Sequence, residues 1–167
     1  MDESEKQKHY ALAEKLLSEE NFVAAMIAGA VATVLAAVAY GLVVSTWRYS
    51  YGFAAVGIGI VVGLAMGYPG RGISTKFAIV ASLYALVGCF LGNVFRAMIV
   101  SEIGRASSPI DVFRNSSLPE AAAEAMSYIS LIDLVYWFVA MFCAAFLARR
   151  SLSRSERLSI GMARLRQ

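Results

Sequence analysis

Four long apolar runs, separated by shorter polar segments, dominate the pattern of this chain. They occupy residues 22–46, 51–68, 77–95 and 128–148. A helix rises 1.5 Å per residue, so about 20 residues cross the ~30 Å hydrocarbon layer of a membrane, and each run is close to that length. The pattern predicts an all-α fold, an integral membrane four-helix bundle that covers residues 22–148.

The composition supports a membrane location and narrows the classes of function. Hydrophobic residues make up 59% of the 167 residues and charged residues 16%, with a mean hydropathy of +0.62. Soluble domains carry about 25% charged residues. The lipid bilayer is therefore the main expected partner, and nucleic acid is not one. The acidic start Met1–Glu5 and the length of the first run do not fit a secretory signal, so we expect a permanent span.

Two polar segments of different character flank the apolar runs. Residues 1–21 place Tyr10, Ala13 and Leu16 at helical spacing among charged residues, which predicts an amphipathic helix on the membrane surface or on a partner protein. Residues 149–167 form a basic tail, suited either to anionic lipid at the membrane surface or to solvent. Its arginines are Arg149, Arg150, Arg154, Arg157, Arg164 and Arg166.

Turn and capping signals mark the connections between the runs. Pro69–Gly72 predicts a tight turn in which glycine tolerates positive φ, and Ser74 is placed to cap the third helix. The polar segment 101–126 is the longest predicted loop. Within it, Ser117 and Glu120 match a capping box, so we expect the fourth helix to start outside the membrane and to continue into it.

The distribution of basic residues sets the expected orientation. Arg48, Arg96, Arg105 and Arg114 fall on one side of the predicted bundle, and the other 11 lysines and arginines fall on the opposite side. Cytoplasmic segments carry the excess of lysine and arginine in membrane proteins. This asymmetry predicts that both termini lie in the cytoplasm and that the 101–126 loop is external.

Small residues recur at spacings of four in three of the runs, a pattern called a glycine zipper. The spacing places them on one helix face, where backbones approach closely and gain van der Waals contact. Packing within one chain is the favoured interpretation, ahead of packing between subunits and of a pore lined by small residues. The ladder residues are Gly29 and Gly41 in the first run, Ala55, Gly59, Gly63 and Gly67 in the second, and Gly88 and Gly92 in the third.

Polar residues inside the runs are few, and Asp133 is the one carboxylate. A charged group at the bilayer centre costs about 2.5–3.5 kcal/mol on insertion scales, which makes Asp133 a candidate functional residue. By helix rise it lies about 8–10 Å inside the fourth run, at the depth of Asn93 and Arg96 near the end of the third. We therefore predict that Asp133 contacts Arg96 or Asn93 and that the third and fourth helices are adjacent.

The chain lacks motifs for catalysis or for binding a metal or cofactor. His9 is the only histidine, and the glycine-rich stretch 57–63 lies within a membrane span rather than between a strand and a helix, where a dinucleotide-binding loop belongs. Cys89 and Cys143 fall at depths that differ by about 10 Å on straight helices, too far for a disulfide. We expect no enzyme activity and no cofactor.

Residues 20–95 also carry a spaced set of short motifs: Asn21-Phe22, Tyr51-Gly52, Ala55-Val56-Gly57-Ile58-Gly59, Val62-Gly63, Lys76-Phe77 and Gly88-Cys89-Phe90-Leu91-Gly92-Asn93. Through these residues the stretch resembles a widespread bacterial family of small four-span membrane proteins that has no assigned activity. The chain departs from that family's pattern at Tyr40, where tryptophan is expected, and at Gly67-Tyr68, where arginine is expected. The resemblance implies four spans in a bacterial inner membrane.

These features favour an accessory or scaffold subunit that packs through its small-residue helix faces into a larger membrane assembly. The alternative is a small homo-oligomeric channel or transporter, with the ladders at subunit seams and Asp133 in the pathway. Ion transport normally uses several ionisable groups through the membrane, and this chain has one carboxylate there, which disfavours transport by the monomer.

Cysteines introduced at Ser107 and Ser153 should react with a membrane-impermeant maleimide from opposite faces of the membrane. The charge asymmetry places the 101–126 loop outside and the tail inside. The reaction is followed in sealed cells and in inverted vesicles. Labelling of both positions from one face would contradict the four-span topology.

Overall fold

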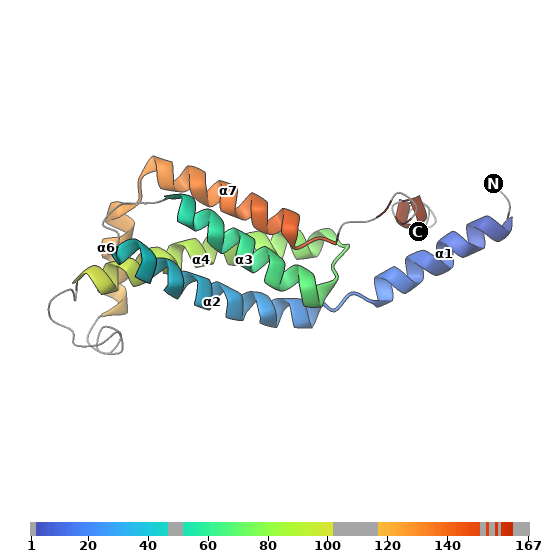
Figure 1. The fold of residues 1–167 in the computed structure, drawn as a ribbon, viewed down its shortest axis with the longest axis horizontal. Helices are drawn as coiled ribbons and strands as arrows, with labels where there is room; N and C mark the ends of the chain where they lie inside the picture. The colour runs from blue at the N-terminus through green and yellow to red at the C-terminus, as the bar shows by residue number, and fades with distance from the viewer. Residues whose placement is uncertain are drawn as a thin grey trace.

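The computed structural model describes residues 3–46, 52–101, 117–150, 153, 156 and 158–161. Its helices are α1 (Glu3–Ser18), α2 (Phe22–Thr46), α3 (Gly52–Gly70), α4 (Thr75–Ser101), α6 (Leu118–Tyr128) and α7 (Leu131–Leu147). The all-α prediction is confirmed. Figure 1 shows α2, α3, α4 and α7 packed together lengthwise, with α1 extending from one end. Most of the predicted 101–126 loop lies outside the described residues.

Length and hydropathy make the chain a multi-pass membrane protein. Each of α2, α3 and α4 is long and apolar enough to cross a membrane, and α7 provides a fourth span if it is taken together with α6. Both termini lie at the same end of the bundle (Figure 1), as an even number of crossings requires. We call this end the terminal end and the opposite one the α6 end.

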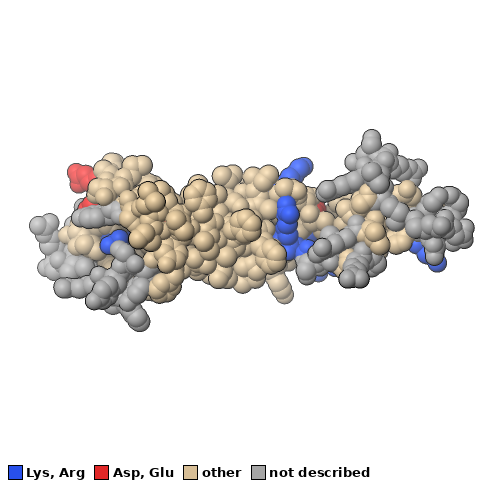
Figure 2. Space-filling view, turned by 90° about the horizontal axis from the view of Figure 1, so that it is seen from above, with Lys and Arg blue, Asp and Glu red and all other residues tan. Residues whose placement is uncertain are grey.

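Charged side chains are confined to the two ends of the bundle. On α4, Lys76 and Arg96 are 20 positions apart with no charged residue between them. That separation corresponds to about 30 Å of helix, the thickness of the hydrocarbon layer. Figure 2 shows a broad band of uncharged residues with the visible charged side chains on either side of it.

The helices α3 and α4 form the centre of the bundle. They pack on each other, and both α2 and α7 pack against the two of them. Among the described residues the backbones of α2 and α7 do not come close to each other, so these helices flank the central pair. Among the described helices, the short helix α6 packs on α4 alone, beyond the end of α7.

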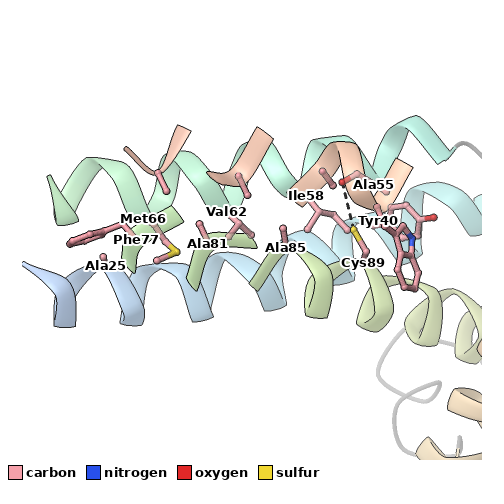
Figure 3. Packing of buried hydrophobic residues seen from close by; sticks show 14 of the residues in the cluster. Ala25, Tyr40, Ala55, Ile58, Val62, Met66, Phe77, Ala81, Ala85 and Cys89 are labelled. Carbon is pink, nitrogen blue, oxygen red and sulfur yellow. Dashed lines mark hydrogen bonds between the residues drawn. The ribbon is translucent and has the colours of Figure 1, made fainter. Parts of the chain in front are cut away.

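Small side chains point inward and large ones outward, the reverse of a soluble bundle. Alanines such as Ala81 and Ala85 are fully buried in the core around Met66 and Phe77 (Figure 3). Lipid is as apolar as leucine, so burial of large side chains between helices gains little, whereas close backbone contact gains van der Waals energy. The exposed large residues include Val31, Leu35, Phe138, Phe142 and Phe146.

The connection between α3 and α4 differs from the predicted turn. Helix α3 continues through Pro69 to Gly70, and the residue with positive φ is Arg71, at 45°. Gly70 and Gly72 are needed instead because the Phe77 ring leaves no room for a side chain at either position. A Cβ on Gly70 would lie 2.7 Å from the Phe77 ring, and one on Gly72 would strike the same ring.

The fourth apolar run is broken, although the sequence predicted one helix through it. Helices α6 and α7 are bent by 106° at the break between them. Ser117 precedes α6, but its side chain makes no capping hydrogen bond, so the predicted capping box with Glu120 is wrong. The 17 residues of α7 reach the lower limit for a span only if α7 starts at the membrane boundary.

Alanine at Gly57 and alanine at Gly59 should change stability in opposite directions. A Cβ on Gly57 would meet nothing within 4 Å, whereas one on Gly59 would strike the carbonyl group of Ala140 on α7. Gly57→Ala should stabilise by up to about 1 kcal/mol, because glycine is a poor helix former. Gly59→Ala should destabilise by about 1–3 kcal/mol through overpacking.

Thermal unfolding in detergent measures both variants, and each serves as the control for the other on one helix. Equal effects at the two positions would show that α3 and α7 are not in contact at Gly59.

Candidate functional site

The small-residue ladder of α3 lies against α7 and α4 of the same chain. A Cβ on Gly63 would lie 2.9 Å from the Leu147 Cβ, and one on Gly67 would lie 2.5 Å from the Leu147 carbonyl oxygen. The Ala55 carbonyl accepts a hydrogen bond from the Cys89 thiol of α4, with an Sγ–O distance of 3.9 Å (Figure 3).

The other ladder glycines also face helices of their own chain. On α4, a Cβ at Gly88 would lie 2.7 Å from Ile58, and one at Gly92 the same distance from the Tyr40 ring. On α2, Gly29 faces Met66 and Tyr84, and Gly41 faces Phe95. Contacts within one chain therefore account for all seven glycines of the predicted ladder, and these faces are already occupied.

Asp133 lies in the first turn of α7 rather than deep in a span. Its carboxylate accepts from the backbone N–H of Ser130 at 3.0 Å, and its own N–H donates to the Ser130 hydroxyl at 3.3 Å, which completes a capping box. The negative charge also sits at the positive end of the helix dipole. The run is interrupted just before Ser130, so Asp133 is two residues from the start of α7 rather than within a helix that begins at Tyr128.

The predicted contact of Asp133 with Arg96 or Asn93 is not formed. The Asn93 amide donates to the Cys89 carbonyl at 3.2 Å, and Arg96 makes no hydrogen bond or ion pair with any other described residue. The α6 end holds Arg96 near the C-terminus of α4 and Asp133 at the start of α7. Helices α4 and α7 are adjacent, as predicted.

The sequence does carry the signal for this cap. Ser130 and Asp133 are three residues apart immediately before an apolar run, the pattern of a capping box. Of the two matches to this pattern in the chain segment 117–133, the one at Ser130 forms the cap and the one at Ser117 does not.

Arg96 and Asn93 instead line a pocket of about 200 Å³ together with Glu124 of α6. Its remaining wall is apolar and consists of Ala97, Val100 and Ala125. Helix α6 is held on α4 by a small cluster in which Ala121 and Ala125 pack against Val94, Ala97 and Met98. Sequence reasoning missed Glu124, because only the break after Tyr128 turns α6 back over α4.

A second polar site lies at the terminal end. The Glu20 carboxylate accepts from the backbone N–H groups of Ile73 and Ser74, at 2.6 and 2.7 Å, and from the Ser74 hydroxyl. The predicted capping residue Ser74 thus directs its hydroxyl hydrogen to Glu20. Charge-assisted hydrogen bonds contribute about 1.5–3 kcal/mol each, so Glu20 holds the start of α4 to the segment that joins α1 and α2.

Glu19 extends this site to the end of α7. One carboxylate oxygen lies 3.4 Å from Arg71 and 3.3 Å from Arg150, and the Arg150 backbone N–H donates to the Gly72 carbonyl at 2.9 Å. Exposed ion pairs contribute only about 0–1 kcal/mol each. We call Glu19, Glu20, Arg71 and Arg150 the terminal-end cluster; it joins three connections of the chain.

The apolar face of α1 packs on the C-terminal segment. Ala13 and Leu16 are buried with Ile160, and the His9 Nδ1 lies 2.7 Å from the Ser159 hydroxyl. These contacts cover part of the face that was expected to meet lipid or a partner.

The basic tail is only partly described. Arg149 is exposed, Arg150 belongs to the terminal-end cluster and lies 3.7 Å from Glu156, and Arg154, Arg157, Arg164 and Arg166 lie outside the described residues. A backbone hydrogen bond from Ser153 holds the pKa of Glu156 below its ordinary value. This contact therefore stabilises the fold at neutral pH and is lost as acid protonates the carboxylate.

Comparisons with protein-family models, with curated proteins and with solved structures find no match. The resemblance of residues 20–95 to a bacterial family gains no support from them. Within the described part of the chain, no group of three or more His, Cys, Asp or Glu side chains could hold a metal ion. The findings support a small all-helical protein with three to four candidate membrane spans.

Ser130→Ala and Asp133→Ala should each lower the stability by about 1 kcal/mol, the typical cost of a lost helix cap. The double variant should cost little more than either single change, because the two residues act in one reciprocal box. Asp133→Ala and Arg96→Gln should be additive, since the two side chains do not bond. Denaturation in detergent gives the coupling energies, and a coupling above about 0.5 kcal/mol between Asp133 and Arg96 would contradict the structure.

Proposed function

We propose that this chain is a non-enzymatic accessory or scaffold subunit of a larger assembly in a bacterial inner membrane, with its terminal end in the cytoplasm. The terminal-end cluster is the observation that carries the proposal. Through Glu19 and Glu20 it ties the base of α1 to the connection between α3 and α4 and to the end of α7. The bundle thereby serves as a fixed base for α1, which extends away from it (Figure 1).

The surface of α1 suits a protein partner. Its apolar residues Ala13 and Leu16 are covered by the chain's own C-terminal segment, whereas Ala11, Glu14 and Lys15 are exposed on the remaining surface. A mixed charged surface on a fixed helix supports a specific polar contact rather than insertion into lipid. The ladder faces, through which a scaffold was expected to pack into a larger assembly, are filled by the chain itself.

The channel alternative has weaker support. A homo-oligomeric channel requires that the small-residue ladders lie at the contacts between subunits and that Asp133 lies in the transport pathway. The ladder glycines pack within the chain, and Asp133 caps α7. The Thr33 hydroxyl, a buried polar group of α2, donates to the Gly29 carbonyl of its own helix.

Photo-crosslinking in the native host tests the proposal. A photoreactive amino acid at Ala11 on α1 should form one discrete adduct with a different polypeptide. The same amino acid at Ile27, which is 62% exposed on α2 and faces lipid, is the matched control and should form none. Glu14→Lys, which reverses a charge on the exposed side of α1, should reduce the adduct at Ala11 severalfold if the contact is polar and specific.

Flux through proteoliposomes containing the purified chain tests the alternative. Adducts of the chain with itself, together with ion or solute flux, would contradict the scaffold proposal in favour of a homo-oligomeric channel.

A further inference from the structure

The pocket at the α6 end presents opposite charges that do not pair. Arg96 of α4 and Glu124 of α6 both line it, yet no ion pair joins them, and Asn93 lines it as well. Both charged side chains are half-buried. A volume of about 200 Å³ is below the roughly 300–1,000 Å³ of pockets for drug-sized ligands, so it suits a group of a few heavy atoms.

The depth of the pocket matches that of lipid headgroups. Arg96 is about 30 Å of helix from Lys76, so the two cations bracket the hydrocarbon layer. Asp133 lies in the first turn of α7, at the same end of the bundle. Val100, which lines the pocket, is 45% exposed. A lipid could therefore place its headgroup here while its acyl chains follow the apolar helix surface.

The lining selects the chemistry of the occupant. A guanidinium binds phosphate oxygens through paired hydrogen bonds, and a carboxylate accepts from an ammonium group. The Glu124 carboxylate would repel a ligand that carries only negative charge, and the Arg96 guanidinium would repel one that carries only positive charge. A zwitterion carrying a phosphate and a primary ammonium satisfies both.

We propose that the pocket formed by Asn93, Arg96 and Glu124 binds the phosphoethanolamine headgroup of a membrane lipid. Arg96 binds the phosphate, and Glu124 accepts hydrogen bonds from the ammonium group. Phosphatidylcholine shares the phosphate but has no N–H to donate, and phosphatidylglycerol has no cation. The site should therefore rank phosphatidylethanolamine above both.

Native mass spectrometry of the purified full chain, in mixed micelles with each lipid at the same mole fraction, measures the lipid retained. Thermal unfolding in the same micelles measures the stabilisation. The wild-type chain should retain more phosphatidylethanolamine than either other lipid. Arg96→Gln should lower retention of all three lipids, and Glu124→Gln should lower retention of phosphatidylethanolamine about tenfold, to the level of phosphatidylcholine.

Matched variants keep the test decisive. Glu120→Gln removes the same charge from an exposed position of α6, outside the pocket, and should leave the lipid ranking unchanged. If Arg96→Gln does not fold, Arg96→Lys keeps the charge and should retain the ranking with weaker binding, because it loses the paired geometry.

Three results would overturn the proposal. One is retention of phosphatidylglycerol equal to or above that of phosphatidylethanolamine. Another is an equal effect of Glu124→Gln and Glu120→Gln, which would separate Glu124 from the ligand. The third is equal stabilisation by water-soluble phosphoethanolamine at millimolar concentration, which would assign the site to a soluble zwitterion rather than to a lipid.

Discussion

Close approach of helix backbones is the interaction on which this bundle depends. Lipid provides no hydrophobic drive between helices, so contact area and short distances must hold them together. Gly59, Gly63 and Gly67 bring α3 onto the backbone of α7, while Gly88 and Gly92 admit side chains of α2 and α3. The central position of α3 and α4, the small interior residues and the large lipid-facing ones all follow from this requirement.

The bilayer sets a second constraint, because it excludes charge from the middle of the protein. The charged side chains therefore lie at the two ends of the bundle, and they have a different role at each end. At the terminal end, Glu19 and Glu20 connect distant parts of the chain and fix the base of α1. At the α6 end, Asp133 is satisfied locally by capping α7, which leaves Arg96 to face Glu124 across a pocket.

The sequence predicted what depends on local pattern and failed where tertiary geometry decides. Helix α2 has the expected bounds, since nothing interrupts its apolar run. The bend before Ser130 was missed because an apolar run shows no break on hydropathy alone, and it moved Asp133 from the interior to a helix start. The residues that face the ladder glycines could not be predicted from the sequence, and neither could the place of Glu124 in the pocket. Both depend on which helices are neighbours in the fold. The positive φ lies at Arg71, and Gly70 and Gly72 on either side of it have no room for a Cβ.

The central claim is that the α3 ladder is closed by α7 of the same chain. Spin labels at Tyr68 and Arg149, both exposed and at the terminal ends of α3 and α7, test it in a chain whose Cys89 and Cys143 are replaced by alanine. Double electron–electron resonance should give one short distance that persists when labelled protein is diluted with excess unlabelled protein. Loss of that distance on dilution would show that α7 comes from another subunit and would contradict the claim.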